Sequence, residues 1–193
     1  PNITTYGFCH NNPVVLVDPD GMGDYYNKAG RWLGNDGRKD NIAYLADAVS
    51  KDKAGRNHFQ NANVLSLKNS ELNIFANTVA QESSGNKIES FALASAIKNL
   101  ADYKGKSIMQ TIQTEGIFGY RDGGNNTQYN NNAEYSMAAV LNAITGGKDF
   151  SNGAIRWDGF DLAIKGWQHV KSKNQGLGIS RSHYQTFYSY WAG

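Results

Sequence analysis

The sequence predicts a mainly α-helical domain with a small irregular or β-hairpin element, preceded by a short tail of one strand and its turns. Apolar residues recur at the i, i+3, i+4 and i+7 spacing of a helix face in several segments. A polar, glycine-rich segment interrupts this pattern. Near the start, a short apolar run lies between two groups of turn-forming residues, which is typical of a strand.

The tail occupies residues 1–22. Its apolar run at residues 14–17 follows Asn-Asn-Pro and precedes Asp-Pro-Asp-Gly, and both groups favour turns. Residues 23–45 place two glycine-containing turns around short aromatic pieces, which predicts a linker or a small hairpin. From about residue 46 the periodicity is helical, so residues 46–193 are the predicted main domain.

Three segments of the main domain predict helices. The first follows Ser70, a good N-cap. Its apolar stripe consists of Leu72, Phe75, Ala76 and Val79. The second covers residues 89–101, and the third covers residues 133–145 and ends at two glycines. Residues 119–132 are too polar and glycine-rich for a helix, so they predict a long loop or an irregular hairpin.

Size and charge exclude several classes of protein. A chain of 193 residues is long enough for one ordinary domain with an appendage. The formal net charge of +2 is too small for a nucleic-acid-binding tail, and no apolar run is long enough to cross a bilayer. The single Cys9 and four histidines have no metal-ligand spacing, so we expect no metal or cofactor. Because the chain starts at Pro1, we expect a piece of a longer protein.

The tail "PVVLVDPDGM", residues 13–22, resembles the motif that closes the core of RHS-repeat proteins. In that family the core cuts itself just after the motif. The resemblance implies that Asp18 and Asp20 are the aspartates needed for cleavage and that the cut follows Met22, which stands where the family usually has leucine. The alternative is that both aspartates only build a tight turn.

The same resemblance implies a biological setting. In RHS-repeat proteins a large β-shell encloses a variable C-terminal toxin, often delivered by a type VI secretion machine between competing Gram-negative bacteria. A chain that follows such a core is expected to be a secreted antibacterial toxin. Its expected partners are the RHS shell, the secretion apparatus and a cognate immunity protein.

Glu82 is the first candidate catalytic residue. It lies three residues after Val79, so we expect it at the partly buried C-terminal end of its helix. The helix dipole and partial burial both disfavour a carboxylate there, which suits a general acid. Ser83 and the small polar residues after it provide a sharp exit with room for a substrate. The alternative is that Glu82 points to solvent or pairs with Lys87.

Two resemblances point to a cell-wall substrate. "AQESSGN", residues 80–86, resembles the Glu-Ser motif of lysozyme-like lytic transglycosylases, whose sole acid/base is a glutamate that ends a helix. "ESFALASAIKNLA", residues 89–101, resembles the Ala-rich helix of spore-cortex and related cell-wall hydrolases, with Asn99 matching and Leu100 replacing their arginine. Both families act on peptidoglycan glycan strands, so together they imply a lysozyme-like domain that cleaves them.

The remaining candidate site residues come from polar and aromatic segments. A hydrolase needs a second carboxylate, and the candidates are Glu89, Asp122, Asp158 and Asp161. We choose Asp122 in the polar loop as the catalytic candidate, although a plain Asp-Gly turn is the simpler explanation of it. Trp157 and Asp158 lie in "RWDGFD", where an indole beside carboxylates suits a sugar, and a turn is again the alternative. With Ser83 and Tyr120, these residues are expected to shape a groove.

Two rival functions stay open. His58 lies in "GRNHFQNAN", which resembles a fragment of an HNH-type nuclease but lacks a second histidine at a useful spacing. A nuclease toxin would act in the cytoplasm, whereas a peptidoglycan-cleaving toxin would act in the periplasm of the target bacterium, without nucleic acid or membrane insertion. The other rival is a non-enzymatic adaptor or cell-wall-binding tail.

Overall fold

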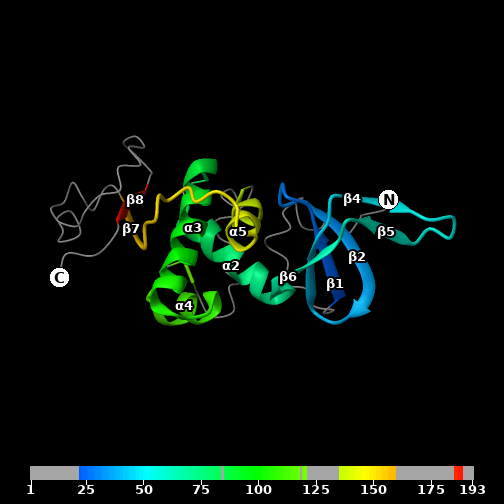
Figure 1. The fold of residues 1–193 in the computed structure, drawn as a ribbon, viewed down its shortest axis with the longest axis horizontal. Coiled ribbons are helices and arrows are strands. Elements are labelled where there is room, and N and C mark those ends of the chain that lie inside the picture. The colour runs from blue at the N-terminus through cyan, green and yellow to red at the C-terminus, as the bar shows by residue number, and fades with distance from the viewer. Residues whose placement is uncertain (1–21, 84, 118, 121–134, 160–184, 189–193) are drawn as a thin grey trace.

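The computed structural model describes residues 22–83, 85–117, 119–120, 135–159 and 185–188. Strands fill the first part of the described chain, helices follow, and a strand pair comes last (Figure 1). The strands are β1 (Met22–Tyr26), β2 (Trp32–Lys39), β3 (Ile42–Leu45), β4 (Ala48–Lys51), β5 (Asn57–Gln60), β6 (Asn63–Lys68), β7 (Arg156–Gly159) and β8 (Gln185–Tyr188). The helices are α2 (Asn69–Glu82), α3 (Lys87–Lys104), α4 (Ile108–Thr114) and α5 (Ser136–Ile144).

The prediction of a mainly α-helical, lysozyme-like fold is wrong. The described region is 40% helix and 27% strand, so the protein combines α and β structure. Six strands precede the first described helix, and residues 46–68, predicted to be helical, form β4, β5 and β6. In β6 the buried Leu65 stands between the exposed Val64 and Ser66, an alternation with the period of a strand.

The first sheet has four strands in the order β2-β1-β3-β6. β1 is antiparallel to β2 and parallel to β3, and β3 is antiparallel to β6, so the sheet is mixed. β4 and β5 form a separate antiparallel hairpin, and β7 and β8 form a third pair. Figure 1 shows the four-stranded sheet and the hairpin on one side of the helices and the β7–β8 pair on the other.

The turn between β1 and β2 packs directly on α5. Asn27 builds this turn, because its Oδ1 accepts hydrogen bonds from the backbone N–H groups of Ala29 and Arg31, both at 3.0 Å. Gly30 has φ of 79°, and a Cβ there would lie 2.5 Å from the backbone nitrogen of Ala138. Only glycine fits both the left-handed backbone and this approach. The sheet is therefore held against the helices at this turn.

A polar cluster joins the sheet to the start of α2. Asp24, 7% exposed, accepts hydrogen bonds from Trp32 Nε1 at 2.5 Å and from Asn69 Nδ2 at 2.6 Å. Asn69 Oδ1 in turn accepts from the Tyr26 hydroxyl at 2.9 Å. Asn69 is the first residue of α2, so this cluster fixes the helix on the sheet.

The helices begin and end at residues suited to those positions. α2 starts one residue before Ser70, the predicted N-cap, and Glu71 Oε2 accepts from the backbone N–H of Lys68 instead. Asn86 caps α3 through its side-chain oxygen, and Gly105 ends α3 in the left-handed conformation. The three predicted helices are thus present as α2, α3 and α5.

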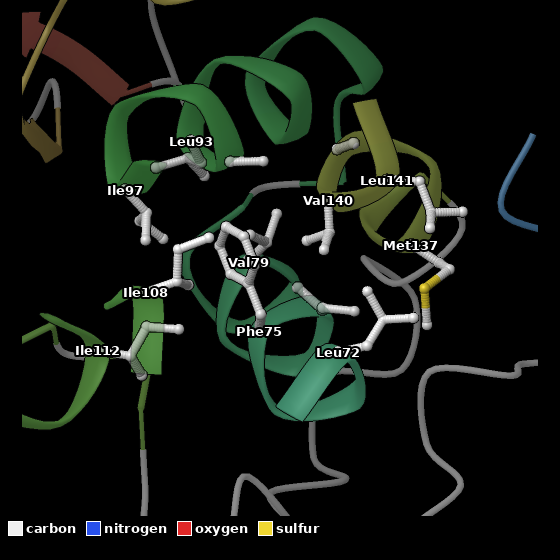
Figure 2. Close-up of a cluster of buried hydrophobic side chains, with 14 of the residues drawn as sticks. Leu72, Phe75, Val79, Leu93, Ile97, Ile108, Ile112, Met137, Val140 and Leu141 are labelled. Carbon is white, nitrogen blue, oxygen red and sulfur yellow. The ribbon is translucent and has the colours of Figure 1, made fainter. Parts of the chain in front are cut away.

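The hydrophobic core lies between the helices (Figure 2). α2 contributes Leu72, Phe75 and Val79, all at 0% exposure, and they point toward side chains from the other helices. Those side chains are Leu93, Ile97, Ile108, Ile112, Met137, Val140 and Leu141. Burial of this apolar surface holds α2 in place, and with it the residue at its C-terminal end. Within the described residues, no helix has the length and apolarity to span a membrane.

Candidate active site

Glu82 is the last residue of α2, as the sequence predicts, and its side chain is half-buried. Ser83 follows as the C-cap in an extended conformation, so the chain leaves the helix at once. The last turn contains no basic residue that would offset the negative end of the helix dipole. The backbone of α2 therefore opposes the charged form of this carboxyl group.

Two N–H groups from distant parts of the chain reach the Glu82 carboxyl group. The backbone N–H of Gly119 donates to Oε1 at 2.5 Å, and Trp157 Nε1 donates to Oε2 at 3.0 Å. Hydrogen bonds of this kind favour a carboxylate, so they oppose the effect of the helix dipole. The carboxyl group is held in one orientation between these donors.

Gly119 approaches α2 so closely that no side chain fits. A Cβ at this position would lie 2.6 Å from the carbonyl oxygen of Thr78 and 2.8 Å from Glu82 Cγ. Both distances are shorter than ordinary contacts, and the first involves backbone that cannot move aside cheaply. The glycine is therefore what allows a backbone N–H to reach Glu82.

Of the two predicted aromatic residues, Trp157 contacts this carboxyl group, and Tyr120 is next in the chain to Gly119, which also contacts it. Trp157 stands on β7, is half-buried, packs against the core and donates to Glu82. Tyr120 directly follows Gly119, is also half-buried, and packs against the same core. The structure thus brings Glu82 and Trp157 into contact, two residues that the sequence singles out separately.

Ser83 belongs to the turn after α2. Its side chain is buried, its Oγ lies 2.9 Å from the Oγ of Ser90, and it accepts a hydrogen bond from the backbone N–H of Gly85 at 3.1 Å. These contacts tie the end of α2 to the first turns of α3. Ser83 therefore helps to hold the turn between α2 and α3 in place.

The other predicted residues are only partly placed. Asp122, Asp18 and Asp20 lie outside the described residues. The backbone of Asp158 lies in β7, next to Trp157, where it pairs with Thr186 of β8. Met22 is the first residue of β1, where it pairs with Lys39 of β2. The roles assigned to these residues stay predictions.

Glu115 is a neighbour of the site that the sequence does not reveal. It follows α4, accepts a hydrogen bond from Lys106 Nζ at 2.6 Å, and its Oε2 lies 3.7 Å from the guanidinium of Arg156. The hydrogen bond from Lys106 holds the pKa of Glu115 below its usual value. Arg156 directly precedes Trp157, so this ion pair fastens β7 to the end of α4. No sequence pattern connects residues so far apart.

His58 lies away from these residues, on β5 of the β4–β5 hairpin, with an exposed side chain. In the part of the chain that the structure describes, no group of three or more His, Cys, Asp or Glu side chains could hold a metal ion. No described contact therefore favours the nuclease interpretation of His58.

The site combines a half-buried carboxyl group, an indole beside it and a backbone donor. These groups can hold a sugar ring and transfer a proton to an oxygen. The chain matches no protein-family model, no curated protein and no solved structure. Its function is therefore inferred from these residues and from the sequence motifs.

Proposed function

We propose that the protein is an antibacterial toxin that cleaves the glycan strand of peptidoglycan by general acid catalysis from Glu82. The observation that carries this proposal is the contact of Glu82 with Trp157. It unites the predicted acid with a predicted sugar-binding residue 75 positions further along the chain. The Glu-Ser motif at Glu82 supports the choice of substrate.

In the proposed reaction Glu82 gives its proton to the oxygen between N-acetylmuramic acid and N-acetylglucosamine, and the bond from this oxygen to the muramic C1 breaks. In a hydrolase, water then adds to C1 with help from a second carboxylate, for which Asp122 is our candidate. In a lytic transglycosylase, the muramic 6-hydroxyl attacks C1 instead and forms a 1,6-anhydro ring. In the hydrolase the second carboxylate takes the proton of the attacking water, whereas in the lytic transglycosylase Glu82, now a carboxylate, takes the proton of the 6-hydroxyl.

The aromatic residues are proposed to bind the sugar. The indole of Trp157 offers a flat apolar face for a sugar ring while its N–H orients Glu82. Tyr120 and Asp158 are proposed to supply further groups that bind sugar hydroxyls, and Ser83 is proposed to keep the turn after α2 in shape. The chemistry needs no metal or organic cofactor.

The tail motif supports a delivery route. We propose that the chain is released from an RHS-repeat shell by cleavage after Met22, which would require Asp18 and Asp20, and is carried by a secretion apparatus to a competing bacterium. Its substrate lies in the periplasm of the target. A producing cell would then need a cognate immunity protein that blocks the site.

Directed expression in a Gram-negative host tests this function. Export to the periplasm is expected to cause rounding and lysis, whereas retention in the cytoplasm is expected to be harmless, because the substrate is absent there. The exported Glu82→Gln variant is expected to be harmless. The exported control Asp102→Asn, which alters an exposed carboxylate on α3, is expected to lyse cells like the unaltered protein.

Other outcomes would identify the rivals. Toxicity only from the cytoplasm, accompanied by degraded nucleic acid, would contradict the proposal and favour a nuclease. Cell-wall binding without lysis from either compartment would favour an adaptor. Lysis that survives Glu82→Gln would leave a cell-wall enzyme but remove Glu82 as its acid.

A further inference from the structure

Trp157 reaches Glu82 from a segment that α3 holds in place. Asn99, on the C-terminal half of α3, donates hydrogen bonds through Nδ2 to three acceptors in this segment. They are Asp149 Oδ2 at 3.0 Å, Ser151 Oγ at 3.1 Å and the carbonyl oxygen of Ala154 at 3.2 Å. The side-chain amide of Asn99 thus binds residues 149–154 to α3. β7 begins shortly after these residues.

The held segment is ordered by its own hydrogen bonds as well. Asp149 accepts from the backbone N–H of Ser151 at 2.7 Å and from that of Gly153 at 2.8 Å. Burial alone would raise the pKa of Asp149, but its hydrogen bonds, including that from Asn99, hold the pKa below its usual value. Ser95 of α3 accepts from the backbone N–H of Phe150 at 3.2 Å. The backbone of residues 149–154 is therefore held in one conformation by its hydrogen bonds to α3.

We propose that Asn99 is a positioning residue for the cleavage reaction, because it sets residues 149–154 and β7 so that the Trp157 indole donates to Glu82. This inference rests on the proposed function of Glu82. Asn99 acts through Trp157 and does not touch the substrate. Ala154 is fully buried and lies only three residues before Trp157. A shift of residues 149–154 is therefore expected to move the indole of Trp157.

The Trp157 hydrogen bond affects the acid in two ways. It fixes the orientation of the carboxyl group, and it favours the charged form of Glu82. If the indole shifts, the carboxyl group can rotate away from the glycosidic oxygen, and the rate falls. Loss of the bond also lets Glu82 keep its proton to higher pH, so the alkaline limb of the pH–rate profile moves upward. A merely structural weakening would lower the amount of folded protein without moving this limb.

A second interaction that holds β7, the ion pair of Arg156 with Glu115, is weaker than the hydrogen bonds of Asn99. Arg156 and Glu115 are 3.7 Å apart, which is an ion pair without a close hydrogen bond. Glu115 also accepts a closer hydrogen bond from Lys106 Nζ, at 2.6 Å, so its carboxylate is shared between two cations. Asn99 is therefore expected to contribute more to the position of Trp157.

The test compares Asn99→Ala and Asn99→Asp with a matched control. The alanine variant removes all three hydrogen bonds, and the aspartate variant replaces the donor with an oxygen that repels Asp149. The control Asn142→Ala also removes an amide donor from a backbone carbonyl, that of Lys148 at 2.8 Å, but leaves the Asn99 contacts intact. Both Asn99 variants are expected to lower kcat about tenfold to hundredfold with little change in KM, and to move the alkaline limb upward. The control is expected to do neither.

A readout that does not need activity separates this inference from the proposed function. The indole N–H resonance of Trp157, assigned with Trp157→Phe, is expected to follow the titration of Glu82 in the unaltered protein and in Asn142→Ala. In both Asn99 variants the resonance is expected to shift and to lose this dependence. If Asn99→Ala leaves the resonance and its pH dependence unchanged, Asn99 does not position Trp157. If the resonance behaves as expected but no glycan is cleaved, the proposed function fails while the positioning role stands.

Discussion

Replacement of Glu82 by glutamine is expected to lower the rate of glycan cleavage by about 10²- to 10⁴-fold, the usual contribution of a general acid. Glutamine has nearly the same shape and can still accept one hydrogen bond, from Gly119 or from Trp157. It has no proton to give to the leaving oxygen. We expect the loss in kcat, because the acid acts on the transition state rather than on substrate binding.

The rate loss must be separated from a loss of folding. Glutamine places an NH2 group opposite one of the two N–H donors, so a small decrease in stability accompanies the change. Circular dichroism and the urea midpoint, recorded beside the rate of dye release from labelled peptidoglycan, distinguish the two effects. Asp102→Asn serves as the carboxylate-to-amide control. A Glu82→Gln protein that cleaves within about tenfold of the unaltered rate contradicts the role of Glu82 as the acid.

Replacement of Asp24 by alanine is expected to lower the free energy of unfolding by about 3 kcal/mol, because a buried amide donor and a half-buried indole donor lose this acceptor. These donors are Trp32 Nε1 and Asn69 Nδ2, and they come from β2 and from the start of α2. The same cluster fixes α2 on the sheet, so loss of Asp24 also weakens the contact between the two parts of the fold. Urea unfolding followed by circular dichroism measures the change.

A matched control is available on the same sheet. Asp40 lies between β2 and β3 with an exposed side chain, which accepts a hydrogen bond from the backbone N–H of Ile42 at 3.2 Å. Its replacement by alanine is expected to cost less than about 1 kcal/mol. Equal losses for Asp24→Ala and Asp40→Ala would show that the buried cluster does not couple the sheet to α2.

The three longer helices were predictable because their apolar residues follow a single period. Leu72, Phe75 and Val79 lie three or four positions apart, and all face the core. α4 was missed because it has only seven residues. Its signal was present, since Ser107 and Gln110 form a capping box at its start.

The sequence predicts residues 23–45 only as a linker or small hairpin and residues 46–68 as helical, although both stretches form strands. β2 contains glycine, asparagine and aspartate, which have low strand propensity, and its pairing with β1 overrides that preference. β6 shows the alternation of a strand at Leu65 and Leu67, but the pattern is too short to stand out beside the helices. A mainly α-helical fold was therefore predicted where the tertiary pairing of weak strands produces a mixed one.

The candidate site was predictable only in parts. The position of Glu82 at a helix end follows from the apolar stripe before it and the turn residues after it. Its contact with Trp157 joins residues 75 positions apart and depends on the packing of β7, which local patterns cannot specify. The hydrogen bonds of Asn99 to residues 149–154 are equally non-local.

We propose above all that this protein cuts the bond between N-acetylmuramic acid and N-acetylglucosamine. The most direct test is mass spectrometry of the soluble material that the purified protein releases from purified peptidoglycan. We expect disaccharide-containing fragments that end in muramic acid, with a reducing end from a hydrolase or a 1,6-anhydro end from a lytic transglycosylase. Release of free peptides alone, or a wall left intact, would contradict it.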